Sequence, residues 1–183
     1  MHLETPLTEN KINKLKAGDK IYLSGHLYTA RDQAHKKLYE LIENNKELPI
    51  NIENAIIYYT GPAPARPGRV IGPCGPTTSY RMDKYTPALL KMGLKAMIGK
   101  GPRSKRVVEL IKENKAVYFA ATGGAAALLS KRIIDSKVVA YPKLDTEAIR
   151  LLKVRDFPLV VINDIYGNDL YDMGKNKYKE IKV

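Results

Sequence analysis

The loop over residues 72–78 carries the residue types best suited to binding a small anion. It contains two Gly-Pro pairs and ends in Thr77 and Thr78, where a helix is predicted to begin. Backbone N–H groups and the positive end of the helix dipole favour an anion there. Arg81 lies about one helical turn after Thr77, so its guanidinium can bind a carboxylate in the same space. The alternative is that a threonine only caps the helix and Arg81 is a surface cation.

A second group of polar residues surrounds a predicted strand-to-helix junction. The segment 25–35 contains Arg31, Asp32 and two histidines, His26 and His35. In α/β proteins ligands bind at such junctions. The histidines are nine residues apart with no third ligand nearby, so we predict no metal site in this chain. The alternative is a capped helix start with a local Arg31–Asp32 contact.

Lys100 forms the third candidate, because it stands between Gly99 and Gly101 at the end of a predicted strand. Glycines let the backbone come close to an anion. The spacing is not that of a phosphate-binding loop, since Lys100 is followed by glycine, and residues 122–124 lack the spacing of a dinucleotide loop. Three loops at strand ends therefore each offer one cation. Together with a threonine hydroxyl, they suit a small dianion better than a polymer.

Strands and helices alternate along the chain in the order that positions these loops. This alternation predicts an α/β fold with a largely parallel central sheet flanked by helices. Thr29 is expected to cap the first helix. The predicted strands cover 20–24, 54–59, 69–71, 95–98, 116–121, 137–141, 151–154, 159–163 and 169–172. The predicted helices cover 31–45, 79–92, 104–114 and 124–131.

The length and composition of the chain limit the classes of protein to which it can belong. The 183 residues, 44% hydrophobic and 27% charged, predict a single domain over 1–183. We expect no membrane span and no secretory signal, because no long apolar run exists and the N-terminus is not basic. A lone cysteine, Cys74, can form no intrachain disulfide and cannot hold an iron–sulfur cluster by itself. A reduced, cytoplasmic setting is therefore expected.

The net charge of +12 leaves several kinds of partner open. Such a surplus is found in proteins that bind nucleic acid, acidic membranes, anionic small molecules or acidic subunits. The lysines are scattered and no aromatic-interleaved stripe accompanies them, so a nucleic-acid-binding module is the less favoured alternative.

Several motifs resemble those of one enzyme family. Thr29-Ala30-Arg31-Asp32, Tyr59-Thr60-Gly61-Pro62, Gly75-Pro76-Thr77-Thr78-Ser79-Tyr80-Arg81-Met82-Asp83 and Gly99-Lys100-Gly101 are similar, in this order, to class I fumarate hydratases and L(+)-tartrate dehydratases. The similarity is to the β subunit, which corresponds to the C-terminal domain of the single-chain enzymes. It covers nearly the whole chain.

The resemblance implies a swivelling β/β/α domain that closes over an α subunit. The α subunit would carry a [4Fe–4S] cluster on its own cysteines, so Cys74 is not required as a ligand. The residue matching Thr77 would be the catalytic base. Those matching Arg31, Arg81 and Lys100 would hold a small dicarboxylate substrate.

The resemblance therefore implies a hydro-lyase subunit that acts on fumarate and (S)-malate, with L(+)-tartrate as the alternative substrate. Water elimination needs a proton taken from the carbon next to a carboxylate, and fixed cations stabilise the charge that develops. Cations also make an ionised threonine less unfavourable. His26 replaces a residue expected to be Thr or Ile in many fumarases, which leaves the substrate open. Self-association of the isolated chain also stays open.

Overall fold

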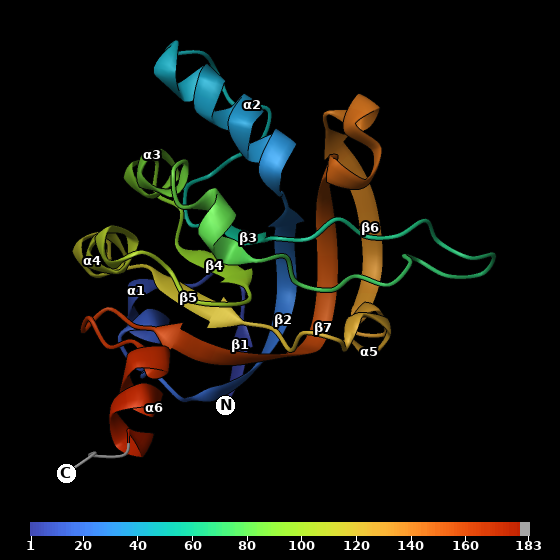
Figure 1. The fold of residues 1–183 in the computed structure, drawn as a ribbon. Helices are drawn as coiled ribbons and strands as arrows, with labels where there is room; N and C mark the ends of the chain where they lie inside the picture. The colour runs from blue at the N-terminus through green and yellow to red at the C-terminus, as the bar shows by residue number, and fades with distance from the viewer. Residues whose placement is uncertain (180–183) are drawn as a thin grey trace.

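The computed structural model describes residues 1–179, which form a seven-stranded sheet with helices packed against it (Figure 1). Residues 180–183 of the predicted domain lie outside the described part. The strands are β1 (His2–Glu4), β2 (Lys20–Thr29), β3 (Ile56–Tyr58), β4 (Ala96–Gly99), β5 (Val117–Ala120), β6 (Ile133–Ala140) and β7 (Ile149–Asn163). The α-helices are α1 (Glu9–Ile12), α2 (Asp32–Glu43), α3 (Thr86–Lys91), α4 (Lys105–Glu113), α5 (Ala126–Ser130) and α6 (Leu170–Tyr178). Two 3-10 turns, η1 (Ser79–Met82) and η2 (Pro142–Glu147), complete the described elements.

Five of the strands close into a barrel-like ring. β2, β3, β4 and β5 pair in parallel in that order, and β7 pairs antiparallel with both β5 and β2. Val160 of β7 makes the closure, since it pairs with Lys20 on one side and Ala120 on the other. β1 extends the ring at β2 in parallel, and β6 extends it at β7 antiparallel. The α/β prediction is confirmed, and the sheet is parallel from β1 to β5 only.

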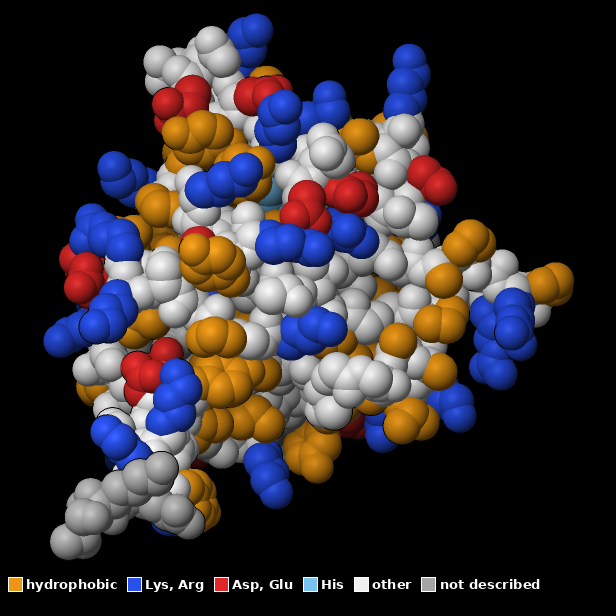
Figure 2. Space-filling model, in the orientation of Figure 1, with side chains coloured by type: hydrophobic (Ala, Val, Ile, Leu, Met, Phe, Trp, Pro, Cys, Tyr) orange, Lys and Arg blue, Asp and Glu red, His pale blue; other side chains and the backbone are white. Residues whose placement is uncertain are grey.

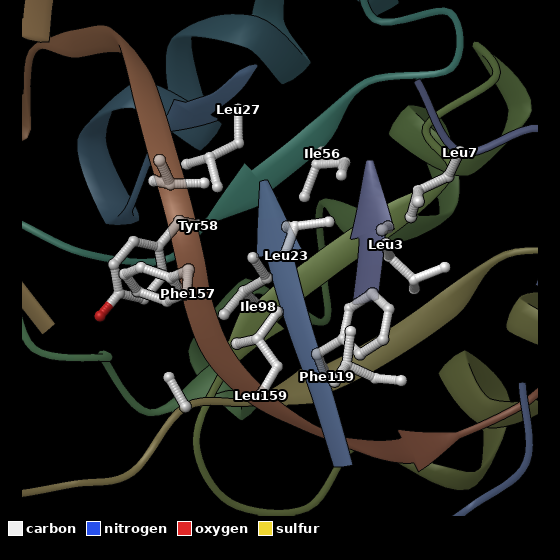
Figure 3. Packing of buried hydrophobic residues seen from close by; sticks show 14 of the residues in the cluster. Leu3, Leu7, Leu23, Leu27, Ile56, Tyr58, Ile98, Phe119, Phe157 and Leu159 are labelled. Atoms are coloured by element: carbon white, nitrogen blue, oxygen red, sulfur yellow. The ribbon is translucent and has the colours of Figure 1, made fainter. Parts of the chain in front are cut away.

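Successive residues of the parallel strands belong alternately to two hydrophobic cores. In β3, Ile56 and Tyr58 belong to the core inside the ring, whereas Ile57 belongs to the core beneath the helices. This follows from the two-residue period of a strand. Figure 3 shows the inner core, where Tyr58 packs edge-on against Phe157 with ring centroids 5.4 Å apart. Helices α2, α3 and α4 cover the outer core and so fix the loops at the ends of the strands.

Most predicted elements are confirmed to within a few residues. The predictions at 20–24, 31–45, 54–59, 95–98, 104–114, 116–121, 124–131 and 137–141 correspond to β2, α2, β3, β4, α4, β5, α5 and β6. Two short elements, β1 and α1, were not predicted. β2 and β6 are longer than predicted, because each pairs along its length with β7.

The C-terminal third differs from the prediction at two places. Residues 151–154 and 159–163 belong to one strand, β7, which runs through Pro158. A register shift lies next to Pro158, where Asp156 has a φ of 48°, and such irregularities are where a strand tolerates proline. The strand predicted at 169–172 is wrong. Asp169 instead caps helix α6, because its carboxylate accepts hydrogen bonds from the backbone N–H groups of Tyr171 and Asp172.

Three further predictions are corrected. Residues 69–71 form no strand but part of a proline-rich loop. The helix predicted over 79–92 is broken into η1 and α3, with Thr86-Pro87 opening α3. Thr29 does not cap α2, because it is buried at the end of β2. Its hydroxyl donates to the carbonyl oxygen of Ala148 (3.3 Å) and accepts from the Arg150 N–H (3.0 Å).

Among the described residues, no helix has the length and apolar character needed to cross a membrane.

Candidate functional site

The loops that follow β2, β3 and β4 lie at one edge of the sheet, because these strands run parallel and end there. They carry Arg31, Gly61 and Lys100. The loop over 72–78 returns to the same edge, where the Thr77 N–H donates to the carbonyl oxygen of Tyr59 at 2.7 Å. In α/β proteins ligands bind outside the carboxyl ends of parallel strands. The candidate site therefore lies where this rule expects it.

The backbones of Thr77 and Lys100 are hydrogen-bonded to each other. The Lys100 N–H donates to the carbonyl oxygen of Thr77 (3.2 Å), and the Ser79 N–H donates to the carbonyl oxygen of Lys100 (2.9 Å). Gly99 permits this approach, because a Cβ atom there would overlap the Ser79 hydroxyl. Thr77 is partly buried and Lys100 is exposed. The structure thus places the backbone of Lys100 next to that of Thr77.

The geometry predicted around Thr78 and the helix start is wrong. Thr78 occupies the N-cap position of η1, but its side chain makes no capping hydrogen bond. η1 is a 3-10 turn of four residues, so it has few aligned peptide dipoles to favour an anion. Thr77 lies before this turn, and therefore Thr77 and Arg81 are not stacked on one helical face. The anion-binding character of the site rests on side-chain cations instead.

Arg31 and Arg81 are joined through one carboxylate, that of Asp32. Asp32 Oδ2 lies 3.2 Å from Arg31 Nε and 2.9 Å from Arg81 Nη2. Glu147 Oε1 lies 3.6 Å from Arg31 Nε on the other side. Arg31 also packs against Gly61, where a Cβ atom would lie 3.0 Å from its Cδ and Nη1 atoms. The local Arg31–Asp32 contact exists, and it also orients a second guanidinium.

Sequence reasoning missed a buried ion pair behind these residues, Asp83–Arg103. Asp83 Oδ1 accepts from Arg103 Nε at 2.7 Å, and Oδ2 accepts from the Ser104 N–H at 2.7 Å. The Arg103 side chain is fully buried and also donates to the Thr86 hydroxyl at 2.7 Å. Burial acts to lower the pKa of Arg103, but Tyr59 and Asp83 outweigh it and the pKa is raised. This pair ties η1, which carries Arg81, to the loop that carries Lys100.

A buried tyrosine hydroxyl, that of Tyr118, makes a second link between the same segments. It lies 2.8 Å from Ser79 Oγ and donates to the carbonyl oxygen of Gly101 at 2.8 Å. Burial raises the pKa of Tyr118 well above its usual range, so the phenol stays protonated. The guanidinium of Arg103 stacks over the Tyr118 ring at 5.1 Å from its centroid. The buried Tyr118 side chain therefore holds the segment after Thr77 and the loop after Lys100 in place.

His26 and His35 lie in different environments. His26 is exposed on β2, whereas His35 is fully buried in α2. His35 Nδ1 lies 3.0 Å from the carbonyl oxygen of Arg31, and burial lowers the pKa of His35 to about 4. Within residues 1–179, no three His, Cys, Asp or Glu side chains are grouped to hold a metal ion. His35 therefore supports the backbone of Arg31 as a neutral side chain.

Cys74 is buried and held in a hydrogen-bonded loop. Its carbonyl oxygen accepts from the Tyr58 hydroxyl (2.7 Å), and its thiol lies 3.5 Å from the Thr60 hydroxyl. Burial raises the pKa of Cys74 to about 11. A buried thiol with a raised pKa supplies little thiolate, and thiolate is the form that binds metal. These features do not fit a cluster ligand.

An open cavity of about 800 Å³ adjoins the site between α2, α3 and α4. Asp32 and Arg81 line it, together with Lys36, Lys84 and Arg106, whereas Thr77, Arg31 and Lys100 do not. Figure 2 shows acidic side chains among Lys and Arg side chains on this face. The structure therefore makes two pairs, the backbones of Thr77 and Lys100 and the side chains of Arg31 and Arg81, and of these four residues this cavity includes Arg81.

Comparison with known proteins gives matches over nearly the whole chain. The family model described as Fumarase C-terminus matches residues 1–174. A protein of Methanocaldococcus jannaschii assigned as L(+)-tartrate dehydratase subunit beta is 36% identical, over 96% of this chain and 93% of its own length. The anaerobic class I fumarate hydratase of Escherichia coli is 38% identical over 96% of this chain, and fumarate hydratase 2 of Leishmania major is 37% identical over 88%.

The matched share of these relatives differs. The chain spans about a third of the length of the fumarate hydratases, with 33% of the Escherichia coli protein and 29% of the Leishmania major protein covered. It spans nearly all of the Methanocaldococcus jannaschii protein. The match in family model and in these relatives covers the loops that carry Arg31, Thr77, Arg81 and Lys100. This chain belongs to the Fumarase C-terminus family.

Proposed function

We propose that this chain is the β subunit of a [4Fe–4S] hydro-lyase that interconverts fumarate and (S)-malate. The observation that carries the proposal is the backbone pairing of Thr77 with Lys100, beside the Arg31–Asp32–Arg81 bridge, at the carboxyl ends of parallel strands. Two guanidinia and an ammonium group can bind the two carboxylates of a small dicarboxylate. Family membership supports the reaction class.

In this proposal, the ionised Thr77 hydroxyl takes the proton from the carbon next to one carboxylate of (S)-malate, and the C–H electron pair forms the double bond of fumarate. The C–O bond of the neighbouring carbon breaks, and the hydroxide that leaves takes up the abstracted proton and departs as water. A threonine hydroxyl is a weak base in water, but nearby cations lower the cost of its ionised form. Lys100 is proposed as one such cation, because its backbone is hydrogen-bonded to that of Thr77. Arg31 and Arg81 hold and orient the substrate, since bidentate guanidinium contacts define both distance and direction.

The cluster is proposed to belong to an α subunit, because Cys74 is buried with a raised pKa and does not fit a ligand role. The proposed swivelling β/β/α domain closes over that subunit, which completes the open site. The name of the Methanocaldococcus jannaschii relative, a subunit beta, supports a separate α subunit. A cytoplasmic location is part of the proposal and is supported by the single unpaired cysteine.

L(+)-tartrate is the second candidate substrate. It is favoured by the relative of matching length, which is assigned as a tartrate dehydratase subunit. Anaerobic co-expression with the candidate α subunit, followed by turnover assays with fumarate, (S)-malate and L(+)-tartrate, decides between the two. A cluster-loaded complex that turns over none of the three refutes the hydro-lyase proposal.

The role of Thr77 is tested in the same complex. Thr77→Ala and Thr77→Val are expected to lower kcat at least a hundredfold, about 3 kcal/mol, with little change in KM. Thr78→Ala is the matched control, since Thr78 is exposed and its hydroxyl makes no capping bond. Equal, mild losses at both positions would mean that another residue removes the proton.

A further inference from the structure

A narrow arm, residues 61–73, leaves the body of the protein between β3 and η1 and projects past β6 and β7 (Figure 1). Near its base the Ala63 N–H donates to the carbonyl oxygen of Pro73 (3.0 Å), and at its tip the Arg69 N–H donates to that of Arg66 (3.0 Å). A Cβ atom at Gly72 would overlap the carbonyl oxygens of the opposite leg. The two legs therefore pair closely, and prolines restrict the backbone of both.

Within the described residues 1–179, most of the arm is exposed and not packed against other segments. Every residue from Ala63 to Val70 is exposed, and the Val70 side chain keeps half of its surface accessible. Arg66 and Arg69 stand at the tip, and residues 60–80 contain no Asp or Glu to neutralise them. Figure 2 shows Lys and Arg side chains with hydrophobic side chains at this protrusion. A shaped but uncovered cationic arm is suited to contact another molecule.

The arm and its neighbours form a larger surface. A groove of about 400 Å³ lies between the arm and the α5–β6 region, with Arg66, Arg69 and Lys131 in its lining. Beyond the groove, Leu128 and Ile134 expose 65% and 37% of their surface. We name residues 63–70 together with Leu128, Lys131 and Ile134 the arm surface.

The composition of the arm surface fits a protein better than a nucleic acid. Protein interfaces combine an apolar centre with charged groups at the rim. Nucleic-acid interfaces are strongly cationic and bind single strands through stacked aromatic rings. The arm surface exposes large aliphatic side chains and has no aromatic residue. Its cations predict acidic residues on the partner.

The arm surface is continuous with the candidate site. At the base of the arm, the Thr60 hydroxyl donates to the carbonyl oxygen of Gly75 (2.7 Å), and Gly61 packs on Arg31. On the α5 side, the Cys74 N–H donates to the carbonyl oxygen of Ala126 (3.1 Å). A molecule seated on the arm surface therefore lies next to the loops of Thr77 and Arg31.

We propose that the arm surface docks on an acidic, partly apolar surface of the α subunit, and this proposal rests on the proposed function. An α subunit that completes the candidate site must approach the loops of Thr77 and Arg31. The arm begins at these loops and extends into solvent, so it lies on the side from which that subunit would approach. Electrostatic complementarity of this kind sets the association rate and its salt dependence.

The test measures binding of the purified α subunit to the immobilised full-length β chain, by biolayer interferometry at low and moderate NaCl. Arg66→Glu/Arg69→Glu is expected to raise Kd at least tenfold and to flatten the salt dependence. Lys46→Glu/Lys91→Glu changes the net charge equally at exposed positions away from the arm, and should alter Kd less than twofold. Thermal unfolding of both variants should match the wild type, because all four side chains are exposed.

The outcomes separate this inference from the proposed function. If the wild-type chain binds the α subunit and Arg66→Glu/Arg69→Glu binds equally well, the arm inference is wrong and the proposed function stands. If the wild-type chain does not bind the α subunit, both are wrong. Loss of self-association or of RNA binding in the arm variant, with α-subunit binding unchanged, would assign the arm to a second copy or to nucleic acid and overturn the proposal.

Discussion

Breaking the buried Asp83–Arg103 pair should destabilise the protein far more than breaking a surface pair. In Asp83→Asn, the fully buried guanidinium loses its counter-ion at 2.7 Å, and the Ser104 N–H loses a charged acceptor at the same distance. Leaving one buried charge unpaired costs about 3–5 kcal/mol. Arg106→Met removes exposed pairs with Glu109 and Glu113, each worth at most about 1 kcal/mol, and is the control.

Urea unfolding of the purified chain at pH 7.5, followed by far-UV circular dichroism, measures both losses. The double variant Asp83→Leu/Arg103→Met should recover part of the loss, because removing both charges leaves none unpaired in the core. If Asp83→Asn costs no more free energy of unfolding than Arg106→Met, then water or other side chains satisfy Arg103. The reasoning that this pair fixes the site loops would then be refuted.

Three further predictions concern single residues. Because burial lowers the pKa of His35 to about 4, the unfolded chain binds more protons below pH 6.5. Stability should thus fall by up to about 3 kcal/mol between pH 7 and 4, and His35→Phe should reduce that slope in urea titrations. Cys74 should react with Ellman's reagent only after denaturation, and Cys74→Ala should leave the cluster absorbance of the complex unchanged. Arg81→Lys should raise KM for the dicarboxylate and lower kcat, since the bidentate contact is lost; unchanged kinetics would exclude that contact.

The location of the site could be predicted from sequence because it depends on local signals. Glycine and proline mark where strands end, and parallel strands bring those ends to one edge. This is why Arg31, Thr77 and Lys100 were found in separate loops that lie along the same edge of the sheet. Lys100 needed only its flanking glycines to be singled out.

The ion pairs that hold the loops of the candidate site could not be predicted in this way. Arg103 follows Gly101-Pro102 in a polar loop, and nothing local indicates that its guanidinium is buried against Asp83, twenty residues earlier. The sharing of Asp32 between Arg31 and Arg81 depends on two elements that meet only in the folded chain. α6 was missed although Asp169 is a standard capping residue, because the short apolar run after it also fits a strand.

The closure of the ring by β7 has a consequence for synthesis of the chain. β2 is synthesised before β3, β4 and β5, but its antiparallel partner β7 lies at residues 149–163, after all of them. The inner core residues Leu23 and Phe157 can therefore meet only after β7 has been synthesised. Until then, β2 to β5 present unpaired edges, and contacts between such distant segments form slowly. Expression yield should accordingly respond to chaperone supply and growth temperature.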